Sequence, residues 1–222
     1  MNGMMSKEMM MAYLLRAVVM LVAIPVHEAA HAWASWKLGD DTARRAGRMS
    51  LNPMAHFDLM GAVCMIFVGV GWAKPVGINP YRFRRPKQGM ALSAAAGPAS
   101  NLVLAFFSLI AYKLIYYLAP GTAVWEVLFS LSYYMVALNI NLAVFNLLPV
   151  PPWDGSRIAW AFLPQRTYFN IMRYERYIFA AFFLLLMMGF LDGPLGFFNG
   201  LVWQGLDLLT LFVEKGLNTI FY

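Results

Sequence analysis

Long apolar runs constrain this chain more than any other feature of its sequence. A membrane-spanning helix needs roughly 20 apolar residues, within a range of about 17–25. Three runs reach that length and a weaker pair follows them: Met9–Ala34, Met90–Leu118, Val124–Leu148, then Tyr177–Leu191 and Leu195–Val213. Hydrophobic residues occupy 61% of the 222 positions, whereas ordinary soluble domains have about 45–50%. The runs therefore predict an all-α polytopic membrane protein with about five transmembrane helices.

One further apolar run, Leu59–Val70, is short for a span and lies between two basic loops. Cytoplasmic loops carry an excess of Lys and Arg, so two basic loops are expected on the same face. A re-entrant segment would keep them together. Of the 17 Lys and Arg, 14 then lie on the cytoplasmic side, because only Lys7, Arg16 and Lys113 are left opposite. We expect the N-terminus outside and the C-terminus in the cytoplasm.

The charged residues and the single cysteine narrow the possible partners and organisation. The net charge of +6 comes from residues that flank the apolar runs, so we interpret it as a topology signal and expect no nucleic-acid partner. Cys64 is the single cysteine of the sequence, so an internal disulfide is excluded. No composition break divides the chain, so we expect one membrane-embedded domain over 1–222. Its catalytic core would cover 9–155, and residues 156–222 would add C-terminal helices. The bilayer would be that of the cell membrane.

The stretch HEAAH places three ionisable residues inside the first apolar run. On a helix, His27 and His31 lie four residues apart on one face, so both imidazoles can reach one cation. Glu28 lies at the flank of that face, where it can act as general base on a metal-bound water. Zinc suits neutral imidazole. The alternative is a set of polar groups satisfied by neighbouring helices. An ionisable group at membrane depth costs on the order of 2.5–3.5 kcal/mol, which favours the metal site.

A third ligand must come from elsewhere, because catalytic zinc sites usually have three protein ligands and one open position. The same membrane depth favours Asp154, which follows the cytoplasmic end of the run Val124–Leu148. The Asp154–Gly155 dipeptide is also typical of a surface turn. The full set of candidates is His56, Asp58, Glu126, Asp154, Asp192 and Asp207.

The motifs of the core resemble those of the site-2 proteases, zinc metalloproteases that cleave within the membrane. The resemblance covers His27 to Gly155 and looks closest to the small bacterial branch without PDZ or CBS domains. Besides HEAAH, it rests on four stretches: LNPMAHFD (51–58), GWAKPV (71–76), AGPASN (96–101) and NLLPVPPWDG (146–155).

This resemblance implies roles for individual residues. His27, His31 and Asp154 would bind one zinc ion per chain, with Glu28 as the base. Asn146 matches a position that helps stabilise the tetrahedral intermediate, which suits an amide donor. Its alternative role is an interhelical hydrogen bond.

Other residues of the shared motifs receive weaker assignments. Asn101, His56 and Asp58 match the family pattern. We expect Asn101 to be structural, whereas His56 and Asp58 could support a ligand, cap a loop or take part in catalysis. Four residues belong to an extended or hairpin element near the active site, which could hold substrate by strand addition or could be an ordinary turn: Gly71, Lys74, Pro75 and Val76.

The sequence therefore predicts an intramembrane zinc metalloendopeptidase whose substrates are transmembrane segments of other proteins. Two other classes remain open. A metal transporter could also place His and Asp on facing helices, but it does not need a Glu between two His. An inactive homologue could act as a binding partner, but no ligand or base is missing. The sequence does not indicate the oligomeric state.

Overall fold

The computed structural model describes residues 6–60, 73–164, 167 and 173–221. This part of the chain is helical and contains no β-strand. Its elements in order are α1 (Lys7–Lys37), α2 (Thr42–Arg45), α3 (Pro53–His56), the 3-10 turn η1 (Pro80–Arg82), α5 (Pro86–Leu118), α6 (Ala123–Asn146), α7 (Asp154–Trp160), α9 (Glu175–Met187), α10 (Asp192–Leu209) and α11 (Leu211–Phe221).

Three of the described helices, α1, α5 and α6, are long and apolar enough to cross a membrane. The helices α9 and α10 would together make a fourth span if the bent pair is treated as a single broken span. The two helices meet at an angle of 85°. With 13 residues, α9 alone is roughly 20 Å long, which is less than a bilayer core. The described part of this membrane protein is thus all-helical with three or four candidate spans, and the expected count of five is not confirmed.

The expected extended or hairpin element near the site is not confirmed in the described residues. Residues 73–79 have no regular secondary structure, and Gly71 lies outside the described residues, as does most of the run Leu59–Val70.

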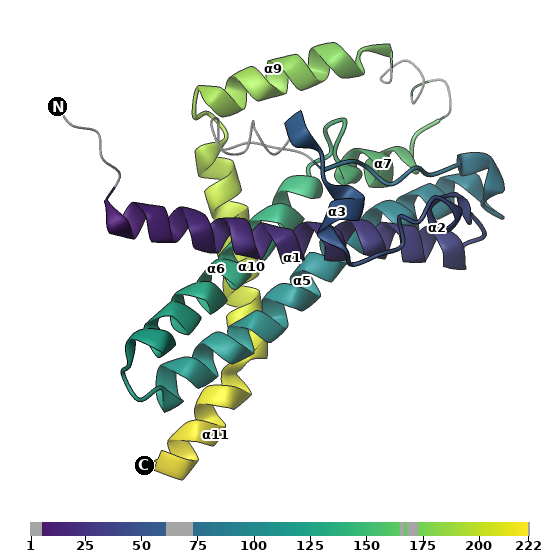
Figure 1. Cartoon of the computed structure of the whole chain (residues 1–222). Helices are drawn as coiled ribbons and strands as arrows, with labels where there is room; N and C mark the ends of the chain where they lie inside the picture. The colour runs from purple at the N-terminus through teal and green to yellow at the C-terminus, as the bar shows by residue number, and fades with distance from the viewer. Residues whose placement is uncertain (1–5, 61–72, 165–166, 168–172, 222) are drawn as a thin grey trace.

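The three spanning helices pack with small and polar side chains inside and large apolar side chains outside. α5 and α6 form an antiparallel hairpin, and α1 crosses both of them (Figure 1). Ala32, Ser93 and Ala105 are fully buried between helices, whereas Leu14 and Phe107 face outward. Small residues let helix backbones approach closely in a membrane, where lipid covers the apolar exterior. This close approach allows backbone and short polar groups of α5 to reach side chains of α1.

One buried cation inside the spans is fully compensated. Lys113 of α5 contacts Asp207 of α10 at 2.8 Å and Glu214 of α11 at 2.9 Å. Charged groups at membrane depth are usually paired with one another. The cluster connects the C-terminal helices to α5 at the end of the bundle remote from α7 (Figure 1).

The two basic loops on either side of the short apolar run touch each other. The Asp40 carboxylate, which is completely buried, accepts hydrogen bonds from the backbone N–H groups of Thr42 at 3.0 Å and Asn79 at 2.6 Å. Asp41 forms ion pairs with both Arg45 and Arg82. Groups in direct contact cannot lie on opposite faces of a bilayer, so the loops around 40–48 and 79–87 share one face.

This contact predicts the labelling of two exposed loop positions. Ala46→Cys and Arg84→Cys, each in a Cys64→Ser background, should react with a membrane-impermeant maleimide from the same side of sealed vesicles. In vesicles of one orientation, we expect either both cysteines or neither to be labelled, because the bilayer blocks the reagent from the other side. Reaction of the two cysteines from opposite sides would contradict the contact between the loops.

Candidate metal centre

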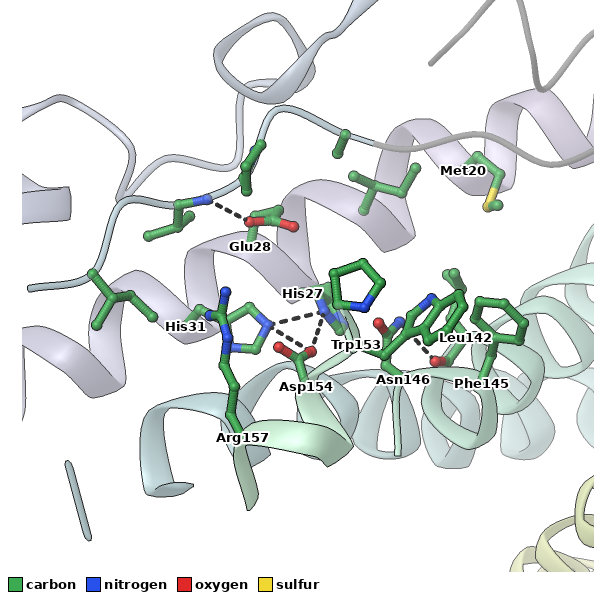
Figure 2. Close-up of a pocket in the computed structure, with 16 residues that line it drawn as sticks. Met20, His27, Glu28, His31, Leu142, Phe145, Asn146, Trp153, Asp154 and Arg157 are labelled. Atoms are coloured by element: carbon green, nitrogen blue, oxygen red, sulfur yellow. Dashed lines mark hydrogen bonds and ion pairs between the residues drawn. The ribbon is translucent and has the colours of Figure 1, made fainter. Parts of the chain in front are cut away.

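Three potential metal ligands from distant parts of the chain meet in one cluster (Figure 2). The Nε2 atoms of His27 and His31 are 3.0 Å apart. The Asp154 Oδ2 atom is 3.2 Å from the first and 3.1 Å from the second. All three side chains are almost fully buried. The ligand atoms therefore form a nearly equilateral triangle.

The size of this triangle fits a tetrahedral metal ion. With zinc–ligand bonds of about 2.0–2.1 Å, two ligand atoms of a tetrahedron lie roughly 3.3 Å apart. The observed edges of 3.0–3.2 Å are close to this value before any ion is placed. Two imidazoles and one carboxylate are also a donor set typical of catalytic zinc, with a fourth position left for water.

Local structure explains why Asp154 reaches the two histidines. His27 and His31 share a face of α1 because they are four residues apart on one helix. Asp154 begins α7, directly after the turn that ends α6. Next to it, Gly155 packs so closely on the residues that follow α6 that a Cβ atom would clash with the Leu147 carbonyl. Glycine at 155 thus lets the start of α7 fold back against α6.

The α5 helix orients both imidazole rings. His31 Nδ1 lies 2.7 Å from the carbonyl oxygen of Ser93, which can only accept, so Nδ1 carries the proton. His27 Nδ1 lies 2.5 Å from Asn101 Oδ1. The Asn101 amide donates in turn to Asn139 of α6 at 2.7 Å. Both rings therefore present an unprotonated Nε2 to the cluster, which is the form that binds metal.

The charge state of Asp154 suits a ligand. Burial alone would raise the pKa of this carboxyl, but His27 and His31, when protonated at Nε2, lower the pKa below its usual range through hydrogen bonds and charge. A bound metal ion would supply the same positive charge in place of these protons. The residue is therefore a carboxylate, which can bind a cation.

The centre opens into a cavity of about 450 Å³ that is lined by residues of α1, α6, α7 and the segment 73–79. Most of the lining is apolar, including Met20, Ile24 and Phe145. Besides the three ligands, three polar side chains line it: Glu28, Asn146 and Arg157. The cavity can hold a short stretch of apolar peptide next to a metal-bound water.

The segment 73–79 is tied to the site by its backbone. The N–H group of Val76 donates to Glu28 Oε2 at 3.1 Å (Figure 2), and that of Lys74 donates to the His56 carbonyl at 2.8 Å. These two N–H groups are thus occupied within the protein. Pro75 lines the cavity between them.

Of the remaining residues that the sequence analysis named, some line the cavity and others lie outside it. Asn146 lines the cavity, and its amide donates to the Leu142 carbonyl at 2.9 Å. His56 is buried outside the cavity, where its Nε2 pairs with the Ser50 carbonyl at 2.8 Å. Asp58 does not line the cavity.

Sequence reasoning missed Ser93, Asn139 and Arg157. Asn139 carried a usable signal, because a polar residue within an apolar run needs a buried partner. Arg157 lies three residues after Asp154 and therefore shares a helical face with it. Ser93 acts through its backbone carbonyl, and no side-chain pattern indicates such a contact.

Helices of membrane-spanning length around a buried His–His–Asp centre define a polytopic membrane protein of the metallopeptidase class. The model of "Peptidase family M50" matches residues 114–190. "Putative zinc metalloprotease YwhC" of Bacillus subtilis (strain 168) is 36% identical over 181 residues, covering 79% of this chain and 80% of the relative. "Putative zinc metalloprotease Rip2" of Mycobacterium tuberculosis (strain H37Rv) is 30% identical over 193 residues. The alignment covers 85% of this chain and 71% of the relative. No solved structure matches the chain significantly. The chain belongs to peptidase family M50, the site-2 protease family.

The closeness of α5 to the imidazoles predicts a sharp effect of Gly97→Ala. A Cβ atom at 97 would overlap the His31 ring and lie 2.6 Å from His27 Cε1. The rings must then move, so metal affinity should fall by at least the 10–100-fold typical of lost supporting contacts. The measurement is metal content of the purified variant after dialysis against graded chelator.

Gly200→Ala in α10 is the matched control, because its Cβ atom would meet nothing within 4 Å. It should retain full metal content and gain up to about 1 kcal/mol of helix stability. Equal metal retention in the two variants would show that α5 does not restrict the imidazoles.

Proposed function

We propose that the protein is an intramembrane zinc endopeptidase that hydrolyses peptide bonds in or near transmembrane segments of other membrane proteins. The observation that carries this proposal is the triangle of His27, His31 and Asp154 ligand atoms with edges of 3.0–3.2 Å. It lies on a helix long enough to span a membrane, and Glu28 lines the same cavity.

His27, His31 and Asp154 would hold one zinc ion per chain. The fit of the triangle and the names of the relatives, which describe zinc metalloproteases, support this ion. When bound, zinc polarises a carbonyl group and lowers the pKa of its bound water to about 7.

Glu28 would act as the general base. Its carboxylate takes a proton from the attacking water as the new C–O bond forms, and delivers that proton to the amide nitrogen as the C–N bond breaks. The hydrogen bond from the Val76 N–H holds one carboxylate oxygen and leaves the other free for this transfer. Asn146, at the cavity wall, would donate its second amide proton to the substrate.

The segment 73–79 would hold an unwound substrate alongside the cavity. Unwinding is needed because the carbonyls of a helix are already hydrogen-bonded and shielded from attack. The inward N–H groups of Lys74 and Val76 are two residues apart, which is the period of extended backbone. Backbone groups at Pro75 and Gly77 then face the opposite edge, where substrate could pair by strand addition.

The protein would lie in the cell membrane as a single catalytic domain. The basic loops that touch through Asp41 and Arg82 would face the cytoplasm, in line with the positive-inside tendency. The N-terminus would lie outside. Because Lys113, near the outer end of α5, pairs with Glu214 at the start of α11, the C-terminal helix would lie on the outer side too, and not in the cytoplasm as expected from the sequence. These loops would also contact anionic lipid.

Metal analysis combined with a proteolysis assay tests the ligand and base roles. Asp154→Ala and His27→Ala should lose zinc and activity. Glu28→Gln should keep about one zinc per chain while cleavage of a transmembrane reporter falls by at least about 10²-fold. Full zinc occupancy in Asp154→Ala would exclude it as a ligand. A transporter would retain metal flux in Glu28→Gln, and proteolysis by that variant would exclude Glu28 as the base.

Substitutions at Val76 test the hydrogen bond to Glu28. Val76→Pro removes the N–H group that donates to Glu28, so we expect cleavage to fall about 10-fold or more. Val76→Ala keeps the N–H group and should be much milder. Zinc content should stay near one per chain in both, because no ligand lies in the segment. Equal cleavage rates would show that this N–H group does not contribute to the reaction.

A further inference from the structure

Arg157 is the only lining residue of the cavity, within the described part of the chain, that carries a permanent positive charge. It lies on α7 one turn after Asp154. Figure 2 shows its guanidinium directed from α7 toward His31 and Asp154. Asn146 lies on the other side of Asp154 in the same view. A guanidinium is thus built into the wall of the metal centre.

This guanidinium has no protein partner in the ranges that the structure describes. It forms no hydrogen bond or ion pair there, although its side chain is half-buried. Two other cations of the described chain are paired: Lys113 contacts Asp207 and Glu214, and Arg82 contacts Asp41. A partly desolvated guanidinium with five unused donors is costly and is suited to receive an anion from outside the protein.

Formal charges in the cavity also favour an incoming anion. A divalent ion and Arg157 contribute three positive charges, and Glu28 and Asp154 contribute two negative charges, which leaves one positive charge. A peptide is neutral and the lining is mostly apolar, so the substrate does not arrive with the matching charge. The reaction itself creates this negative charge. When water adds to the scissile carbonyl carbon, the carbonyl oxygen becomes an oxyanion.

We propose that Arg157 is a catalytic residue that donates hydrogen bonds to this oxyanion. The inference rests on the proposed peptidase function. The C–O bond forms while Glu28 takes the water proton, and the carbonyl π electrons move to the oxygen beside Arg157. The electron pair then returns, the C–N bond breaks, and the proton passes to the leaving nitrogen. Arg157 therefore stabilises charge that is absent from the ground state, which lowers the barrier without tightening substrate binding.

Kinetics of Arg157→Gln in the zinc-loaded full-length protein test this role. Gln keeps polar donors but removes the charge. With an Ala- and Leu-rich transmembrane peptide that lacks acidic residues, kcat should fall about 10²–10³-fold while KM changes less than about twofold. Arg157→Lys should recover part of the loss. Arg84→Gln, an exposed loop arginine outside the cavity, should behave as wild type.

Inhibitor binding provides a readout without turnover. An anionic phosphinate analogue of the same peptide should bind Arg157→Gln more weakly by about the factor lost in kcat/KM. Unchanged phosphinate affinity, unchanged kcat, or loss of zinc or thermal stability in Arg157→Gln would overturn the proposal. A rise in KM alone, confined to peptides with an acidic side chain, would also overturn it and assign Arg157 to substrate selection. Failure of the wild-type protein to cleave any peptide would instead refute the peptidase function, and phosphinate binding would still test the anion site.

Discussion

Burial of charged and polar groups inside a bundle whose exterior faces lipid is the constraint on which this structure depends. An unpaired ionisable group at membrane depth is costly, and the metal-centre residues avoid this cost by contacting groups from other helices. The carboxylate of Asp154 lies against two imidazoles, and the imidazoles lie against Ser93 and Asn101. The packing of α1 on α5 and α7 is therefore determined by hydrogen bonding as much as by shape.

One face of α5 supplies the hydrogen-bond acceptors and the space that the two buried imidazoles need. Ser93, Gly97 and Asn101 recur every four residues, so they lie in a row along the helix. The first accepts from His31, the second leaves room for both rings, and the third accepts from His27. Asn139 continues the row into α6. Glu28 lies at the flank of the α1 face that carries the two histidines, where it accepts a hydrogen bond from the Val76 N–H.

Much of this arrangement could be predicted from the sequence, and the reason is periodicity. Run lengths predicted the three long spans, and the spacing of His27 and His31 predicted a shared helical face. The common depth of two helix ends indicated Asp154. The contact of Val76 with Glu28 could not be predicted, because it depends on how a segment without regular structure lies across α1. Two separate spans in the weak final pair are not confirmed, because α9 and α10 meet at a sharp bend that hydropathy does not reveal.

The ligands also have a mechanical consequence. His31 and Asp154 are 123 residues apart in the sequence, so an ion bound by both would act as a cross-link that closes a very long loop. Cross-links over long loops remove the most chain entropy from the unfolded state, and any ligand that binds only the folded chain raises its stability. The same ion that supports hydrolysis would then hold α7 against α1. Zinc supply would influence how long the protein survives cellular quality control as well as how fast it works.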